Sequence, residues 1–96
     1  MKIEFLRPAA LELIDAVEYY NDQLQGLGDQ FFVEFETGID LVRKFPKAWQ
    51  LIGTNTRRFI MKRFPYMILF IYEKDGIIIT AVAHQHRHPD SYMREK

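Results

Sequence analysis

The sequence has no cysteine, and this absence excludes disulfides, thiolate metal ligands and a cysteine nucleophile. It has no apolar run long enough to span a bilayer, and its first residues, Met1 to Pro8, lack the apolar stretch of a signal peptide. No Gly-, Ser- or Pro-rich linker divides the chain. We therefore expect one cytoplasmic domain over residues 1–96 with no membrane segment.

The composition is typical of a folded domain, with 48% hydrophobic, 15% aromatic and 27% charged residues. The net charge is zero, but the charge is divided unevenly along the chain. Residues 1–41 hold two basic and nine acidic residues, a net charge of −7, and residues 42–96 hold eleven basic and four acidic residues, a net charge of +7. Either the basic half is reserved for an anionic partner, or the two halves neutralise each other in the fold.

The first half of the sequence indicates a strand and two helices. Residues 2–6 alternate as in a strand, and Pro8 suits the first turn of a helix. Apolar residues then recur at helical spacing, and the opposite side of this helix is predicted to be a solvated acidic surface of Glu12, Asp15, Glu18 and Asp22. After a break at residues 25–28, Asp29 is expected to cap a second helix that ends before Pro46.

After Pro46 the hydrophobic period changes from helical to two. Strands are expected at residues 49–52, 57–63, 66–72 and 77–84, with Asp75-Gly76 as the turn of a hairpin. The last strand is apolar enough to be central in the sheet. The sequence therefore predicts an α+β fold, in which an N-terminal strand and a helical hairpin precede a mostly antiparallel sheet of three to four strands, with the hairpin covering one face of that sheet.

The basic segment at residues 57–63 has two interpretations. In a strand, Arg57 and Arg63 share one face, and Arg58 and Lys62 share the other. These side chains could form a patch that binds phosphate or acidic groups, with Arg57, Lys62 and Arg63 as binding residues. Alternatively, they could protect an edge strand from aggregation.

The densest group of polar residues is His84-Gln85-His86-Arg87-His88. Histidine could act as a general acid or base on a ribose hydroxyl, with Arg87 stabilising charge at a phosphate. Alternatively, His84 ends a core strand with a local hydrogen bond, while His86 and His88 are simply exposed. We assign no metal and no cofactor, because acidic or thiol ligands at recognised spacing are missing.

Together, these segments resemble the RelE/ParE family of toxins from type II toxin–antitoxin, or plasmid stabilisation, modules. The resemblance covers nearly the whole chain and rests on order and spacing. It is carried by Ala10-Leu11-Glu12-Leu13, Tyr19-Tyr20, Gly26-Leu27-Gly28, Phe31-Phe32, Pro46, Trp49, Arg57-Arg58-Phe59, Arg63-Phe64-Pro65-Tyr66, the strand ending at His84, Arg87, Pro89 and Tyr92.

The resemblance implies a small cytoplasmic toxin that a cognate antitoxin neutralises and that causes growth inhibition when free. The antitoxin would wrap an extended or helical segment around the toxin, over exposed apolar surface and the basic patch. Operator DNA would be bound only through the antitoxin.

The resemblance leaves the cellular target open between mRNA on the ribosome and DNA gyrase. As an enzyme, the chain would be a metal-independent endoribonuclease with Arg58, Arg87, His84 and Tyr92 as catalytic residues. However, Tyr66 is followed by Met67, where the RNA-cleaving branch usually has an arginine. A gyrase inhibitor would need only a binding surface. The further alternative is a degenerate, non-toxic member that still binds an antitoxin.

Overall fold

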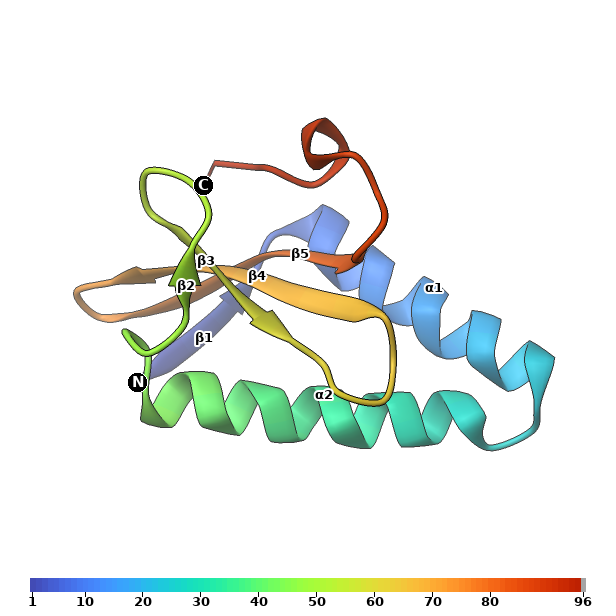
Figure 1. Ribbon diagram of the computed structural model, residues 1–96. Helices are drawn as coiled ribbons and strands as arrows, with labels where there is room; N and C mark the ends of the chain where they lie inside the picture. Colours follow the sequence, from blue (N-terminus) through green and yellow to red (C-terminus); the bar gives the residue numbers. More distant parts are fainter. Residues whose placement is uncertain (96) are drawn as a thin grey trace.

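The computed structural model describes residues 1–95, in the expected order of a strand, two helices and a run of strands (Figure 1). The elements are β1 (Lys2–Phe5), α1 (Arg7–Gln23), α2 (Leu27–Lys44), β2 (Gln50–Leu51), β3 (Thr56–Ile60), β4 (Tyr66–Glu73), β5 (Gly76–His84) and a short 3₁₀ helix (Pro89–Ser91). The α+β prediction is therefore confirmed. Lys96 lies outside the described residues.

The strands form one five-stranded mixed sheet in the order β1-β5-β4-β3-β2. The four strands after the helices pair antiparallel with their neighbours, whereas β1 pairs parallel with β5. This parallel pairing follows from the connection, because α1 and α2 lie between β1 and the rest of the sheet. As predicted, β5 is a central strand, and most of its residues are buried.

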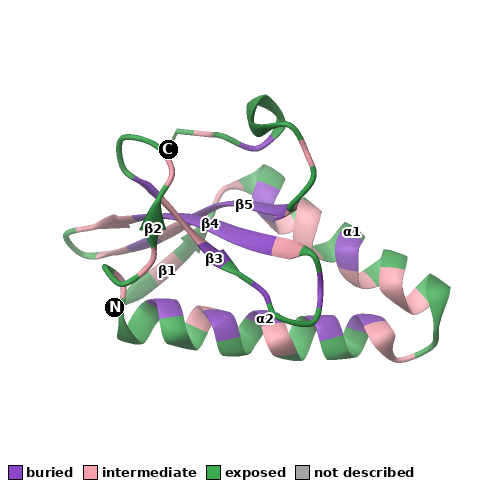
Figure 2. Cartoon of the chain, in the orientation of Figure 1, coloured by how far each residue is buried: buried purple, intermediate pink, exposed green. Residues whose placement is uncertain are grey.

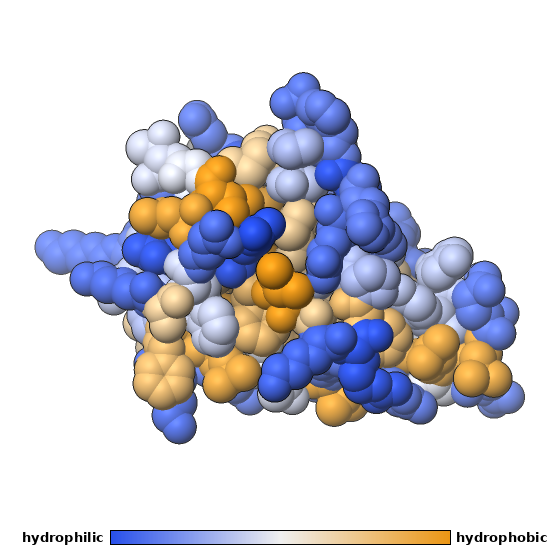
Figure 3. All heavy atoms as spheres, in the orientation of Figure 1, coloured by the Kyte–Doolittle hydropathy of each residue, from blue (hydrophilic) through white to orange (hydrophobic). Residues whose placement is uncertain are grey.

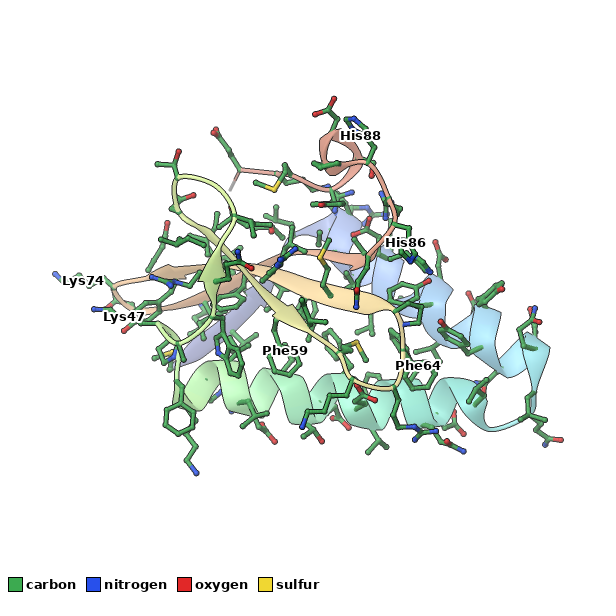
Figure 4. All side chains as sticks on the ribbon, viewed as in Figure 1. Lys47, Phe59, Phe64, Lys74, His86 and His88 are labelled. Atoms are coloured by element: carbon green, nitrogen blue, oxygen red, sulfur yellow. The ribbon has the colours of Figure 1, made fainter. Side chains whose placement is uncertain are left out.

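Both helices pack on one face of the sheet and enclose the larger core (Figures 1 and 2). Phe59 and Phe64 point from the sheet side toward α2 (Figure 4), where Phe64 meets Phe31 edge-on at 5.1 Å between ring centroids. Tyr20 also packs in this core, whereas Tyr19 remains exposed. The aromatic residues of both halves of the sequence therefore meet in one apolar layer.

The opposite face of the sheet carries a second, smaller core, which the sequence did not predict. Met67, Leu69, Ala81 and Ala83 form it, and Tyr92 from the C-terminal segment packs against them. Tyr92 is only 7% exposed. The residues after β5 therefore form a strap that folds back over the sheet, opposite α2 (Figure 1).

The prediction that Asp29 caps the second helix is wrong. The helix begins at Leu27, and its N-cap is Gly26, which has the positive φ of 89° that favours glycine. Asn21 of α1 supplies the capping oxygen instead, because its Oδ1 accepts the Gly28 N–H at 2.7 Å. Asp29 lies in the first turn, where its negative charge interacts favourably with the positive end of the helix dipole.

The hairpin between β4 and β5 is present, but its turn differs from the expected one. The two turn residues are Lys74 and Asp75, and Gly76 is already the first residue of β5. Gly76 has no positive φ, so the turn chemistry does not require glycine here. A Cβ at Gly76 would lie 2.5 Å from the Lys2 carbonyl oxygen, so glycine is needed for the close approach of β1.

Candidate functional site

The Glu12 carboxylate of α1 accepts four hydrogen bonds. Its Oε1 accepts a hydrogen bond from Arg94 Nη1 at 2.8 Å, and its Oε2 accepts from Arg94 Nη2 at 3.0 Å. Arg87 Nη1 donates to the same Oε2 at 2.9 Å. The side chain of Glu12 is only 16% exposed. The prediction that Glu12 belongs to a solvated acidic surface is therefore wrong, because it joins α1 to the strap through two arginines.

Glu12 and Arg94 also complete the hydrogen bonds of β5 beyond the end of β1. The parallel ladder stops at the pair Phe5 and Ile79, which leaves the next part of β5 without a strand on that side. Glu12 Oε1 accepts the Val82 N–H at 3.1 Å, and Arg94 Nη1 donates to the Thr80 carbonyl at 3.0 Å. The ion pair thus substitutes for a missing strand, as buried backbone groups require partners.

The charge state of Glu12 follows from these contacts. Burial alone would raise the pKa of its carboxyl, but the hydrogen bonds from Arg94, Arg87 and the Val82 N–H outweigh burial and lower the pKa below its ordinary value of 4.5. The same hydrogen bond raises the pKa of Arg94. Glu12 is therefore ionised at neutral pH, and it neutralises part of the charge of the arginines that bind it.

The four residues predicted to be catalytic lie on two different faces of the sheet. Arg58 pairs across the strands with Leu69, which belongs to the second core. His84 pairs with Tyr66, which packs against the first core on the helix side. Because cross-strand partners project to the same face, Arg58 and His84 point to opposite faces.

Arg58 and Arg87 make side-chain hydrogen bonds, and Tyr92 is packed in a core. Arg58 donates from Nε and Nη2 to Gln50 Oε1 on β2, at 3.0 and 2.7 Å. Tyr92 packs in the second core, on the same face as Arg58. Arg87 donates to Glu12 and, within the strap, to the hydroxyl and carbonyl oxygens of Ser91. The catalytic roles of these residues stay predictions.

The predicted binding residues have hydrogen-bond partners on different elements. Arg57 donates to the carbonyl oxygens of Lys47 and Trp49, which ties the segment before β2 to β3. The backbone N–H groups of Lys62 and Arg63 donate to Glu34 on α2. The Arg63 guanidinium donates to Gln30 Oε1 at 2.7 Å. These basic residues therefore make hydrogen bonds both to the segment before β2 and to α2.

The charge of the two halves is therefore only partly neutralised in the fold. Among residues 1–95, Glu12 is the one carboxylate of the acidic half that forms a salt bridge with the basic half.

Lys47 and Lys74 project from the end of the sheet farthest from His86 (Figure 4). On the face seen in Figure 3, apolar patches lie over the region of β2 and β3, where Leu51 and Ile60 are exposed.

His84 and Arg87 do line one pocket, between α1 and the end of β5. Its other lining residues include Asp15, Tyr19 and Tyr66. His84 Nδ1 accepts the His86 N–H at 3.1 Å, which matches the local hydrogen bond of the second interpretation and places the proton of the neutral ring on Nε2. The Tyr66 ring meets the His84 ring at 5.4 Å between centroids. His86 and His88 are exposed, as expected (Figure 4).

The surroundings of Tyr66 in this pocket shift the pKa of its hydroxyl. Burial, and then the nearby Tyr19, raise the pKa of Tyr66, so its hydroxyl stays protonated at neutral pH.

Sequence reasoning missed Asp15, Tyr66 and Arg94 as parts of this region, because no motif relates residues that are so far apart in the chain. In the described residues, no group of three or more His, Asp or Glu side chains could hold a metal ion. No helix there is long and apolar enough to cross a membrane.

Comparisons with known proteins agree with the architecture. A family model described as the ParE toxin of type II toxin–antitoxin systems, parDE, matches residues 3–89. The chain belongs to the ParE toxin family. This ParE-family chain matches no curated protein sequence. Among solved structures, one described as the chromosomal ParDE TA system from P. aeruginosa aligns with a TM-score of 0.69 and 14% identity, covering 88% of this chain and 95% of that one. At that identity the likeness shows the fold alone.

Proposed function

We propose that this ParE-family toxin acts by binding and inhibiting DNA gyrase, rather than by cleaving RNA. The observation that carries this proposal is the separation of the predicted catalytic groups. Arg58 and Tyr92 lie on the sheet face opposite His84, and Arg87 is held by Glu12. Acid–base cleavage of RNA requires these groups around a single phosphate, within hydrogen-bond reach of the reacting atoms. Inhibition by binding requires only a surface.

The proposal includes a cognate antitoxin that neutralises the toxin. Family membership in a type II toxin–antitoxin system supports this partner. Exposed apolar residues on the helices, such as Leu11, Ile14 and Val33, offer surface that an antitoxin segment could cover. Operator DNA would be bound through the antitoxin.

A ribosome-dependent endoribonuclease is the second candidate function. It is favoured by one observation, namely that His84 and Arg87 line the same pocket as the Tyr19 and Tyr66 hydroxyls. In this alternative, His84 would be the general acid or base and Arg87 would stabilise the charge on the phosphate. Arg58 and Tyr92 would then have no role in the reaction.

Expression of the chain alone in a bacterial host distinguishes the two functions. Plasmid supercoiling and the 5′ ends of ribosome-associated mRNA are measured in the same culture, and the purified chain is added to a gyrase supercoiling reaction. Growth arrest with altered supercoiling, intact mRNA and inhibition of purified gyrase is the expected result. Arrest with new mRNA ends at ribosomal A-site codons would overturn the proposal.

Two variants sharpen the test. Arg58→Ala and His84→Ala each remove one predicted catalytic group, from opposite faces of the sheet. Arg43→Ala and His86→Ala are the matched controls, because both side chains are exposed. Arg58→Ala and both controls are expected to arrest growth like the wild type, and no variant should produce new mRNA ends. New mRNA ends that form with the wild type and are lost in folded His84→Ala would favour the ribonuclease. A folded wild-type chain that causes no arrest and does not inhibit gyrase would indicate a non-toxic antitoxin-binding member.

A further inference from the structure

A pocket lies beside His84, between α1 and the sheet. Its volume is about 350 Å³, near the lower end of the range for small-molecule pockets of about 300–1,000 Å³. α1 forms one wall with Asp15, Ala16 and Tyr19, and the sheet forms the other with Tyr66 and His84. The two walls come from segments 47 to 69 residues apart (66 − 19 = 47 and 84 − 15 = 69), so only the tertiary fold creates the pocket.

Three aromatic rings line this pocket. Tyr66 and His84 meet edge-on, with an interplanar angle of 72°. Tyr19 lies across from them on α1, where its ring packs edge-on against Tyr20 at 5.2 Å. Faces of electron-rich rings attract cations, and the planar guanidinium of arginine stacks on them best.

The pocket offers one carboxylate acceptor, Asp15, and two hydroxyls that can each accept or donate. Within residues 1–95, the Asp15 carboxylate and the Tyr19 and Tyr66 hydroxyls have no hydrogen-bond partner. Arg87, the cation of the pocket, already donates to Glu12 and Ser91. An anion entering here would meet the unpaired Asp15 carboxylate, whereas a cation would find that carboxylate and two free hydroxyl oxygens.

We infer that this pocket binds the guanidinium of an arginine from a protein partner, with Asp15 accepting its hydrogen bonds and the rings of Tyr19, Tyr66 and His84 enclosing its plane. Arginine fits better than lysine, because its flat fork can both stack on a ring and pair with a carboxylate. The inference rests on the proposed function in one respect only, since it takes DNA gyrase as the source of the arginine. Arginine is also a frequent energetic anchor of protein interfaces.

A small-molecule titration tests the pocket independently of gyrase. The ¹⁵N-labelled full chain is titrated with N-acetyl-arginine N-methylamide and, in parallel, with the lysine, norleucine and glutamate amides. Saturable shifts of the Tyr19, Tyr66 and His84 signals are expected with the arginine amide, with weaker effects from lysine and none from norleucine or glutamate. Asp15→Asn should weaken arginine binding about fivefold, as expected for the loss of one partly exposed charge pair.

Asp22→Asn is the matched control, because Asp22 is another exposed aspartate of α1 outside the pocket. Tyr19→Leu tests the ring contribution while keeping apolar volume. Both Asp15 and Tyr19 are exposed, so circular dichroism of these variants should match the wild type. Equal affinity of wild type and Asp15→Asn for the arginine amide, or preference for the glutamate amide, would overturn the inference.

Inhibition of gyrase by the same variants links the pocket to the proposed target. Asp15→Asn should weaken inhibition, and Asp22→Asn should not. If wild type inhibits gyrase but Asp15→Asn inhibits equally and the arginine amide does not bind, the inference fails and the proposed function stands. If the arginine amide binds as expected but gyrase is not inhibited, the pocket is supported and the proposed function fails.

Discussion

Removal of the Glu12 charge should loosen the strap from α1 and the sheet. Glu12→Gln keeps the size of the side chain but leaves Arg87 and Arg94 without a counter-charge beside each other. Removing one partner of a buried ion pair costs about 3–5 kcal/mol. The two arginine side chains are 37% and 23% exposed and can turn toward water, so we expect the lower value of about 3 kcal/mol. For a domain of this size, that loss lowers Tm by about 12–24 °C.

Urea and thermal unfolding of Glu12→Gln measure this loss, with Glu18→Gln as the control. Glu18 is exposed on the same helix and should change stability by less than about 0.5 kcal/mol. Hydrogen exchange provides a local measurement, because the Val82 N–H loses its charged acceptor and should exchange faster. Equal stability of Glu12→Gln and Glu18→Gln would refute the reasoning that the ion pair holds the strap.

Further expected outcomes concern acid stability, packing and capping. The native pKa of the Glu12 carboxyl lies below 4.5, so its ionised form stabilises the fold fully above that pH, and this stabilisation is lost as pH falls through the lowered native pKa. The difference in unfolding free energy between wild type and Glu12→Gln should therefore shrink as pH falls below 4.5, and Glu12→Gln should show the flatter acid dependence. Gly28→Ala should destabilise by about 2–3 kcal/mol in urea unfolding, because its Cβ would collide with the Val17 carbonyl oxygen and the helices would have to separate. Tyr92→Ala should cost about 3 kcal/mol and increase binding of an apolar dye, because it uncovers the second core. Asn21→Ala should cost about 1 kcal/mol in the same assay, through loss of the cap on Gly28.

The periodicity of the sequence determined most of the fold. Apolar residues at helical spacing specified α1 and α2, and the change to a period of two after Pro46 specified the strands. Burial of a full strand such as β5 also follows from composition alone, because a continuous apolar run can only be stable when both faces are covered. These features depend on neighbours in the chain, so local sequence carries them.

The site depended on contacts that only the tertiary structure decides. Glu12 occurs at a position in α1 that is solvated in an isolated helix, and its role arises only because Arg87 and Arg94 fold back onto it from more than 70 residues away. The separation of Arg58 and His84 onto opposite faces depends on strand register, and a shift of one residue would reverse it. The sequence determined which chemical groups are available and on which elements they lie, whereas long-range packing decided which of them meet, because side-chain proximity depends on the fold and not on spacing in the chain.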